Sequence, residues 1–145
     1  MKIKNQIIEK ETQPGISIFN ITSEIESQIE KSGISNGFVI VSSRHTTTGL
    51  TINECEERLL DDIRLFFNKL IPPSDQYLHN DIHLRDCPPD EPKNAHSHIA
   101  AMLFGSSESI PVAGGKIALG VYQSIMLIEL DGPRSRKVNI QIIGE

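Results

Sequence analysis

Four of the five histidines in this chain of 145 residues lie between positions 79 and 98, although uniform scatter would place fewer than one there. Neutral imidazole is the commonest metal ligand, and three histidines that leave one position open form the catalytic zinc arrangement. The segment is therefore a candidate metal centre. Its members are His79, His83, His96 and His98, and His45 is the remote fifth histidine.

Spacing limits how many of these side chains can share a site. If residues 95–104 form a helix, His96 and His98 are two positions and roughly 200° apart, so only one of them can face a given ligand. His79 and His83 fall in a segment without regular pattern, where spacing decides little. The spacing alone leaves open whether these are ligands or ordinary surface and loop histidines.

A second polar segment, residues 42–49, follows directly after the apolar run 37–41. Its Ser and Thr hydroxyls and Arg44 can donate to phosphate oxygens, and His45 can act as a general base or a metal ligand. The alternative is that the hydroxyls only satisfy the end of a bent strand. The segment is not a phosphate-binding P-loop, because the sequence lacks GxxxxGK followed by Ser or Thr.

Three cations, Arg134, Arg136 and Lys137, follow a Gly-Pro pair near the C-terminus. They could clamp a diphosphate or a carboxylate, or they could simply form a solvated turn. Gln123 and Glu129 interrupt the apolar run 117–130 just upstream. A polar side chain that faces a core needs a partner or a function, and Gln123, beside Tyr122, is the more suggestive of the two. The alternative for Glu129 is a position at a strand end, in water.

The elements that must position these groups follow from hydrophobic periodicity and turn residues. Alternating or continuous apolar runs predict strands, and three- and four-residue spacing predicts a helix from Asn53 or Glu54 to about Lys69. Five prolines make residues 71–94 an irregular loop. The total is about eight strands and three helices without strict alternation, which predicts an α+β or β-sandwich fold. The strands are expected within residues 2–9, 16–21, 37–41, 50–52, 109–112, 117–130 and 137–142, and the other helices at about 23–33 and 95–104.

Composition bounds the functional class. The length fits a single domain over residues 1–145. The chain has 14 basic and 19 acidic residues, which give a net charge of −5, and it contains no Trp. We therefore expect no nucleic-acid partner and no membrane partner. No secretory signal is visible, so we expect a cytoplasmic protein whose Cys55 and Cys87 are both reduced.

Several short motifs, in order along nearly the whole chain, resemble the YjbQ family, an uncharacterised family often named secondary thiamine-phosphate synthase. The resemblance implies a homotrimer whose subunit is a mostly antiparallel, jelly-roll-like α+β sandwich with two to three helices. It also implies an enzyme that joins a pyrimidine diphosphate to a thiazole phosphate. The matching motifs are His45-Thr46-Thr47, Ile52-Asn53-Glu54, Tyr77-x-His79, Ala95-x-x-His98-Ile99, Ile110-Pro111-Val112 and Leu119-Gly120-Val121-Tyr122-Gln123.

The resemblance implies a set of site residues, with His83 and His96 outside it and Tyr122 where the family usually has Trp. The implied metal ligands are His45, His79 and His98. The implied catalytic residues are His45, Glu54 and Gln123. The expected substrate-binding residues are Arg44, Thr46, Thr47, Asn53, Arg134 and Arg136. Histidine ligands favour zinc, whereas diphosphate chemistry usually relies on magnesium, so either divalent metal is an expected cofactor. The expected partner is a small phosphorylated molecule; the alternative is a metal- or small-anion-binding trimer, or a metal-dependent hydrolase.

Overall fold

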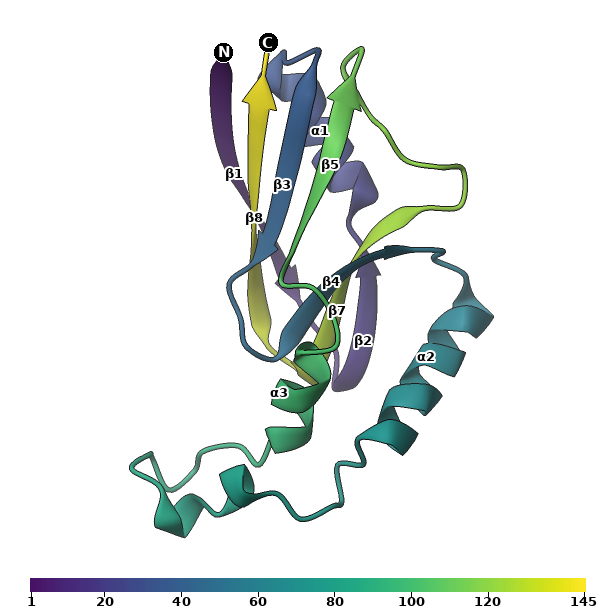
Figure 1. Cartoon of the computed structure of the whole chain (residues 1–145). Helices are drawn as coiled ribbons and strands as arrows, with labels where there is room; N and C mark the ends of the chain where they lie inside the picture. Colours follow the sequence, from purple (N-terminus) through teal and green to yellow (C-terminus); the bar gives the residue numbers. More distant parts are fainter.

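Two antiparallel sheets form the body of the protein in a computed structural model that describes all residues from 1 to 145 (Figure 1). The pairing is antiparallel throughout, so the fold is α+β with mostly strand content, as predicted. The five-stranded sheet has the order β1 (Lys2–Glu11), β8 (Ser135–Gly144), β3 (Gly37–Ser43), β5 (Ser107–Ala113) and β6 (Lys116–Ile117). The three-stranded sheet has the order β2 (Gly15–Asn20), β7 (Ser124–Gly132) and β4 (Thr48–Asn53).

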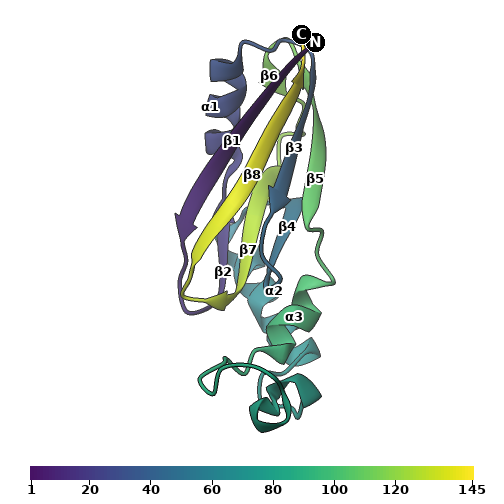
Figure 2. The same cartoon turned by 90° about the vertical axis from the view of Figure 1, so that its left-hand side faces the viewer.

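The core lies between the inner faces of the two sheets and α1 (Thr22–Ser32), which covers one end of them (Figure 2). Alternation along β8 directs Val138, Ile140 and Ile142 inward, because successive side chains of a strand point to opposite faces. The central strand β7 is buried on both faces from Ile125 to Leu130. Its second face packs against residues of β2, α2 and α3. Such double burial explains why β7 reads as a continuous apolar run.

The predicted strand 117–130 is wrong in its first half. β6 ends at Ile117 and β7 begins at Ser124, and a turn separates them. The Oε1 atom of Gln123 accepts a hydrogen bond of 2.8 Å from the backbone N–H of Gly120, which closes this turn. Val121 and Tyr122 consequently project from the molecule, with exposed fractions of 92% and 74%.

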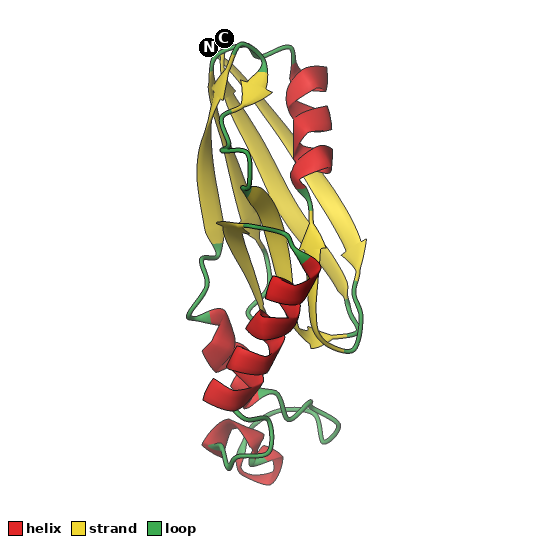
Figure 3. Ribbon diagram, turned by 90° about the vertical axis from the view of Figure 1, so that its right-hand side faces the viewer, coloured by secondary structure: helices red, strands yellow, loops and turns green.

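Helix α2 (Glu57–Leu70) begins later than predicted, because β4 continues to Asn53 by pairing with Ser124. The carboxylate of Glu56 caps the helix by accepting hydrogen bonds from the N–H groups of Arg58 and Leu59. None of the residues of α2 is fully buried, although the helix is strongly amphipathic. The helix lies along one side of the three-stranded sheet (Figure 3).

Helix α3 (Ala95–Ala101) is shorter than the predicted 95–104, since the chain turns after it toward β4. Phe104 then packs on Gly49, where an added Cβ would lie 2.4 Å from the Cβ of Phe104. The Phe104 ring also meets the Phe67 ring of α2, with centroids 4.7 Å apart. The glycine therefore permits the close contact that joins α2 and α3 to the sheet.

Residues 71–94 are irregular, as predicted, except for two single 3₁₀ turns, η1 (Leu78–Asn80) and η2 (Ile82–Leu84). This connection extends beyond the sheets below α3 (Figure 2). Both cysteines are free. No helix of the chain combines the length and apolarity needed to cross a bilayer.

Candidate active site

His79 and His98 come together where the irregular connection meets α3. Their ring centroids are 4.9 Å apart, and the rings are nearly perpendicular at 75°. The side-chain Oδ1 of Asn80 accepts a hydrogen bond of 3.1 Å from the N–H of Ala95, which ties η1 to the first turn of α3. Two residues that are nineteen positions apart in sequence thus form a half-buried imidazole pair.

The surroundings of His98 favour its neutral form. Burial lowers its pKa, and the neighbouring His79 lowers it further, whereas the carboxylate of Asp131 and a hydrogen bond with the Thr46 backbone oppose the shift. Because an unperturbed imidazole titrates near 6.5, a lowered pKa leaves His98 neutral at pH 7. Its contact with Thr46 joins the imidazole pair to the loop that follows β3.

His45 stands apart from that pair. Its Nε2 accepts a hydrogen bond of 2.8 Å from the backbone N–H of Lys137. A backbone N–H can only donate, so the proton of the neutral ring is assigned to Nδ1. Burial lowers the pKa of His45, and the positive charge of Arg136 adds to this. The side chain therefore offers a donor at Nδ1, while Nε2 is already occupied.

The predicted three-histidine metal site is not assembled within one chain. No group of three or more His, Cys, Asp or Glu side chains is placed to hold a metal ion. His79 and His98 are neighbours, whereas the lone pair of His45 Nε2 is directed at Lys137. These residues do not fit a metal with the donor set of a single chain, so no chemical step is assigned to one.

A buried ion pair lies behind the His45 loop. Arg136 Nε and Nη2 each donate to a carboxylate oxygen of Glu129 at 2.6 Å, and Nη2 also donates to Thr47 Oγ1 at 2.8 Å. Glu129 is 0% exposed, which excludes the alternative that it lies in water. Its position follows from alternation along β7, which points it between the sheets toward the inward face of β8.

The Glu129 carboxylate is held in its ionised form. Burial opposes ionisation and raises its pKa, but hydrogen bonds from Arg136, the Asp131 N–H and the Thr12 hydroxyl outweigh burial, so the pKa lies below the usual value. Arg136 and Thr47 were expected to bind substrate. Their positions do not agree with that expectation, because both side chains are buried in the hydrogen-bond network around Glu129. The guanidinium of Arg136 there binds the Glu129 carboxylate through two N–H donors.

Asp131 organises the adjoining β7–β8 turn and was missed in the sequence, where it read only as a turn former. It accepts hydrogen bonds from Arg134 Nε and Nη2 at 3.1 and 2.8 Å and from Asn94 Nδ2 at 2.7 Å. Arg134, an expected substrate ligand, is therefore already paired with a carboxylate. Arg44 and Thr46, by contrast, are exposed, and no carboxylate pairs with Arg44.

The remaining predicted residues lie at the other end of the three-stranded sheet. Asn53 ends β4 opposite Ser124, and Glu54 and Gln123 adjoin them. Strand β4 spans six residues, so its two ends are about 17 Å apart at roughly 3.4 Å per residue. The predicted site thus divides within one chain into two groups. We call them the histidine end, with Thr46, His79 and His98, and the Gln123 end, with Asn53, Glu54 and Gln123.

His83 and His96, both excluded from the predicted site, lie away from the imidazole pair. His83 is exposed. His96 faces a cleft between α2 and α3 of about 110 Å³, and its Nδ1 is buried without a hydrogen-bond partner. That volume is well below the roughly 300 Å³ at which cofactor pockets begin. Helical geometry separates His96 from His98, as the two-residue spacing indicated.

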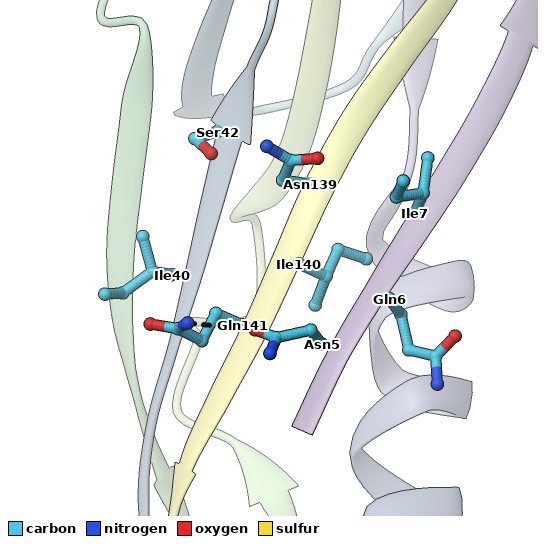
Figure 4. Close-up of a pocket in the computed structure, with 8 residues that line it drawn as sticks. All are labelled: Asn5, Gln6, Ile7, Ile40, Ser42, Asn139, Ile140 and Gln141. Atoms are coloured by element: carbon cyan, nitrogen blue, oxygen red, sulfur yellow. Dashed lines mark hydrogen bonds between the residues drawn. The ribbon is translucent and has the colours of Figure 1, made fainter. Parts of the chain in front are cut away.

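A broad hollow lies elsewhere, on the outer face of the five-stranded sheet (Figure 4). Its side chains come from β1, β3 and β8 and are all uncharged. Asn5 Oδ1 accepts a hydrogen bond of 2.9 Å from Gln141 Nε2 across it. None of the predicted site residues lines this hollow.

Comparison with known proteins places this architecture in a family. The family model described as "UPF0047 protein YjbQ-like" matches residues 6–145. A UPF0047 protein of Methanothermobacter thermautotrophicus is 38% identical over 145 residues, which cover 100% of this chain and 95% of the relative. A UPF0047 protein of Archaeoglobus fulgidus is 39% identical over 132 residues, covering 91% of this chain and 95% of the relative.

Solved structures share the fold over the whole chain. A YbjQ-like protein of unknown function from Sulfolobus solfataricus superposes with a TM-score of 0.88 at 34% identity and covers 99% of both chains. A hypothetical protein of Aeropyrum pernix has a TM-score of 0.88 at 33% identity, with 98% of this chain and 99% of that chain covered. The resemblance noted in the sequence is confirmed at the level of family and fold.

Proposed function

The chain belongs to the UPF0047 YjbQ-like family, and from this we propose that it is an enzyme that joins a pyrimidine diphosphate to a thiazole phosphate and releases diphosphate. The observation that supports the proposal is the His79–His98 pair, with His98 in contact with the Thr46 backbone. Two half-buried imidazoles beside a loop rich in hydroxyls make a polar surface suited to a phosphorylated ligand.

The chemistry of this condensation matches what such a surface can supply. The thiazole nitrogen forms a C–N bond to the pyrimidine methylene carbon as the C–O bond to diphosphate breaks, and the electron pair leaves with the diphosphate. The main demand on the protein is therefore to stabilise developing negative charge with oriented donors. Exposed Arg44 and the Thr46 hydroxyl can supply such donors beside the imidazole pair, where the His98 ring is held by its hydrogen bond with the Thr46 backbone.

A direct assay tests the activity. Purified protein is incubated with both precursors, without metal and with Mg²⁺ or Zn²⁺, and thiamine phosphate is measured. We expect His79→Ala and His98→Ala each to lower the rate by about 100-fold or more, the scale of a lost donor or acid–base group. The exposed His83→Ala is the matched control and should retain the wild-type rate. Wild-type protein that makes no product under any of these conditions would rule the activity out.

Two further measurements on the same protein, diphosphate binding and phosphate release, separate the alternative functions. Binding of diphosphate without product supports a small-anion-binding protein. Release of inorganic phosphate from the pyrimidine diphosphate alone supports a hydrolase. A requirement for added metal would imply ligands beyond those that one chain brings together.

The proposal includes a homotrimer, in which the Gln123 end of one copy completes the histidine end of another. Support comes from the separation of the two groups of predicted site residues by about 17 Å within a chain. Further support comes from α2, whose apolar side chains at i, i+4, i+7 and i+11 form a stripe that the chain itself covers only in part. The stripe consists of Leu59, Ile63, Phe66 and Leu70, and the last two are 58% and 52% exposed.

Light scattering tests this assembly. We expect a mass three times that of the 16.1 kDa chain. Phe66→Asp should shift the mass toward the monomer, because it places a charge in the stripe. Leu65→Asp is the matched control, since Leu65 is 68% exposed and lies outside the stripe, roughly 100° around the helix from Phe66. A monomeric wild-type protein, or equal loss of assembly in both variants, would contradict the proposed interface.

A further inference from the structure

We propose that Arg85, carried by the irregular connection between α2 and α3, supplies the guanidinium of an oxyanion subsite that it forms with His79 and His98. The inference rests on the proposed function for the identity of the site and adds the group that holds the anion. Its ligand class is a phosphate or diphosphate, and its position in the chain was not singled out by any sequence motif.

The first observation is how Arg85 is anchored. Its Nη1 donates a hydrogen bond of 2.8 Å to the backbone carbonyl of His79, the residue whose ring packs on His98. Its backbone N–H donates to the carbonyl of Ile82 at 3.1 Å, which closes η2. The half-buried side chain is therefore held beside the imidazole pair by the backbone of one member of that pair.

The second observation is that the donors of Arg85 are mostly unused. A guanidinium carries five N–H donors in a planar fork, and only the bond to His79 uses one of them here. No carboxylate forms an ion pair with Arg85. Arg134 and Arg136, the two guanidiniums expected to bind the anion, are each paired with a carboxylate. Arg85 is thus a guanidinium beside the histidine pair whose N–H donors are mostly unused.

The third observation is the sign of the local field. The charge of Arg85 and the neighbouring His79 both lower the pKa of His98, so the three groups share one electrostatic environment. The carboxylate that opposes this shift, Asp131, already accepts hydrogen bonds from Arg134 and Asn94. An oxyanion would satisfy the unused donors and balance this positive excess, and bidentate recognition of phosphate is what the guanidinium fork does best.

Calorimetric titration of inorganic diphosphate into the full-length protein, in metal-free buffer, tests the subsite. We expect Arg85→Gln to weaken binding about tenfold, which corresponds to about 1.4 kcal/mol. Arg85→Lys should weaken it less, because an ammonium keeps the charge and loses the fork. Lys31→Gln, an exposed position in the last turn of α1, makes the same charge change far from the site and should bind like wild type.

The possible outcomes discriminate clearly. The inference is overturned if wild-type protein does not bind diphosphate, if Arg85→Gln binds within twofold of wild type, or if Lys31→Gln loses as much. Circular dichroism and thermal midpoints of the variants are compared so that loss of folding is not mistaken for loss of binding, and Arg85→Lys provides the second variant. Diphosphate binding that depends on Arg85, without thiamine phosphate formation, supports the subsite and rejects the activity. Product formation that Arg85→Gln leaves unchanged supports the activity and rejects the subsite.

Discussion

Glu129→Ala is expected to lower the free energy of unfolding by about 3–5 kcal/mol, because removing one partner of a buried ion pair leaves the other charge without compensation. Glu129 is 0% exposed and Arg136 is 5% exposed, so water cannot replace the lost carboxylate without opening the space between the sheets. Thr12 and the Asp131 N–H lose their acceptor at the same time. Urea denaturation of wild type and variant at pH 7 measures the difference.

The Lys10–Glu24 pair provides the control, because its side chains are 24% and 34% exposed. Glu24→Ala makes the same chemical change at a partly exposed pair, for which a loss below about 1 kcal/mol is expected. Comparable losses in the two variants would contradict the assigned role of the Glu129–Arg136 pair.

The pH dependence of this pair follows from the pKa of Glu129, which lies below the ordinary glutamate value of 4.5. A carboxyl group whose pKa is lower in the folded state binds fewer protons there than in the unfolded state near that pH. Its stabilising contribution is therefore present above about pH 4.5 and is lost as the pH falls through the folded-state pKa. The difference in stability between wild type and Glu129→Gln should accordingly shrink between pH 7 and pH 3. A constant difference would show that ionisation of Glu129 is not its source.

Gly132→Ala has the second large expected effect, a loss of up to about 3 kcal/mol of folding stability, the upper end of the usual cost of overpacking. An added Cβ at Gly132 would lie 1.8 Å from the carbonyl oxygen of Gln13 and 3.1 Å from Glu129 Cγ. Because the nearest atom belongs to the backbone, the turn itself would have to move. That movement would displace Asp131, whose charge acts on His98 beside the proposed subsite, so diphosphate binding should weaken as well.

Denaturation and calorimetric titration of Gly132→Ala measure both effects. Gly120→Ala is the control, since its nearest neighbour, at 3.3 Å, is the flexible Gln123 side chain, and a loss below 1 kcal/mol is expected. A Gly132→Ala variant as stable as Gly120→Ala would show that the β7–β8 turn accommodates the methyl group without strain.

Local patterns in the sequence were sufficient for most of the fold. The alternation of Val138, Ile140 and Ile142 predicted β8 and its inward face. The two-residue spacing of His96 and His98 indicated correctly that the two rings diverge. The element limits were less accurate, because strand pairing between Asn53 and Ser124 extends β4 into the segment where the apolar pattern predicted a helix.

The arrangement of the candidate site depended on contacts between distant segments. The antiparallel pairing of β4 with β7 places Thr48 beside Glu129 and Asn53 beside Ser124, and so separates predicted site residues that a linear motif groups together. The burial of Glu129 depends on β8 lying across from β7 with Arg136 on its inner face. Arg85 lies beside the histidine pair only because its loop returns to α3, where the His79 carbonyl accepts its hydrogen bond.

By itself, then, the sequence determined the family, the strand-rich α+β class and the candidate histidines, because periodicity and residue type are properties of short segments. Only the tertiary structure decided which charges are paired and which remain free. Along the chain Arg134 and Arg136 stand out and Arg85 does not, yet the fold brings a carboxylate to the first two and a pair of imidazoles to the third. The physical reason is that ion pairing acts through space, between residues whose separation in sequence carries no information about their distance.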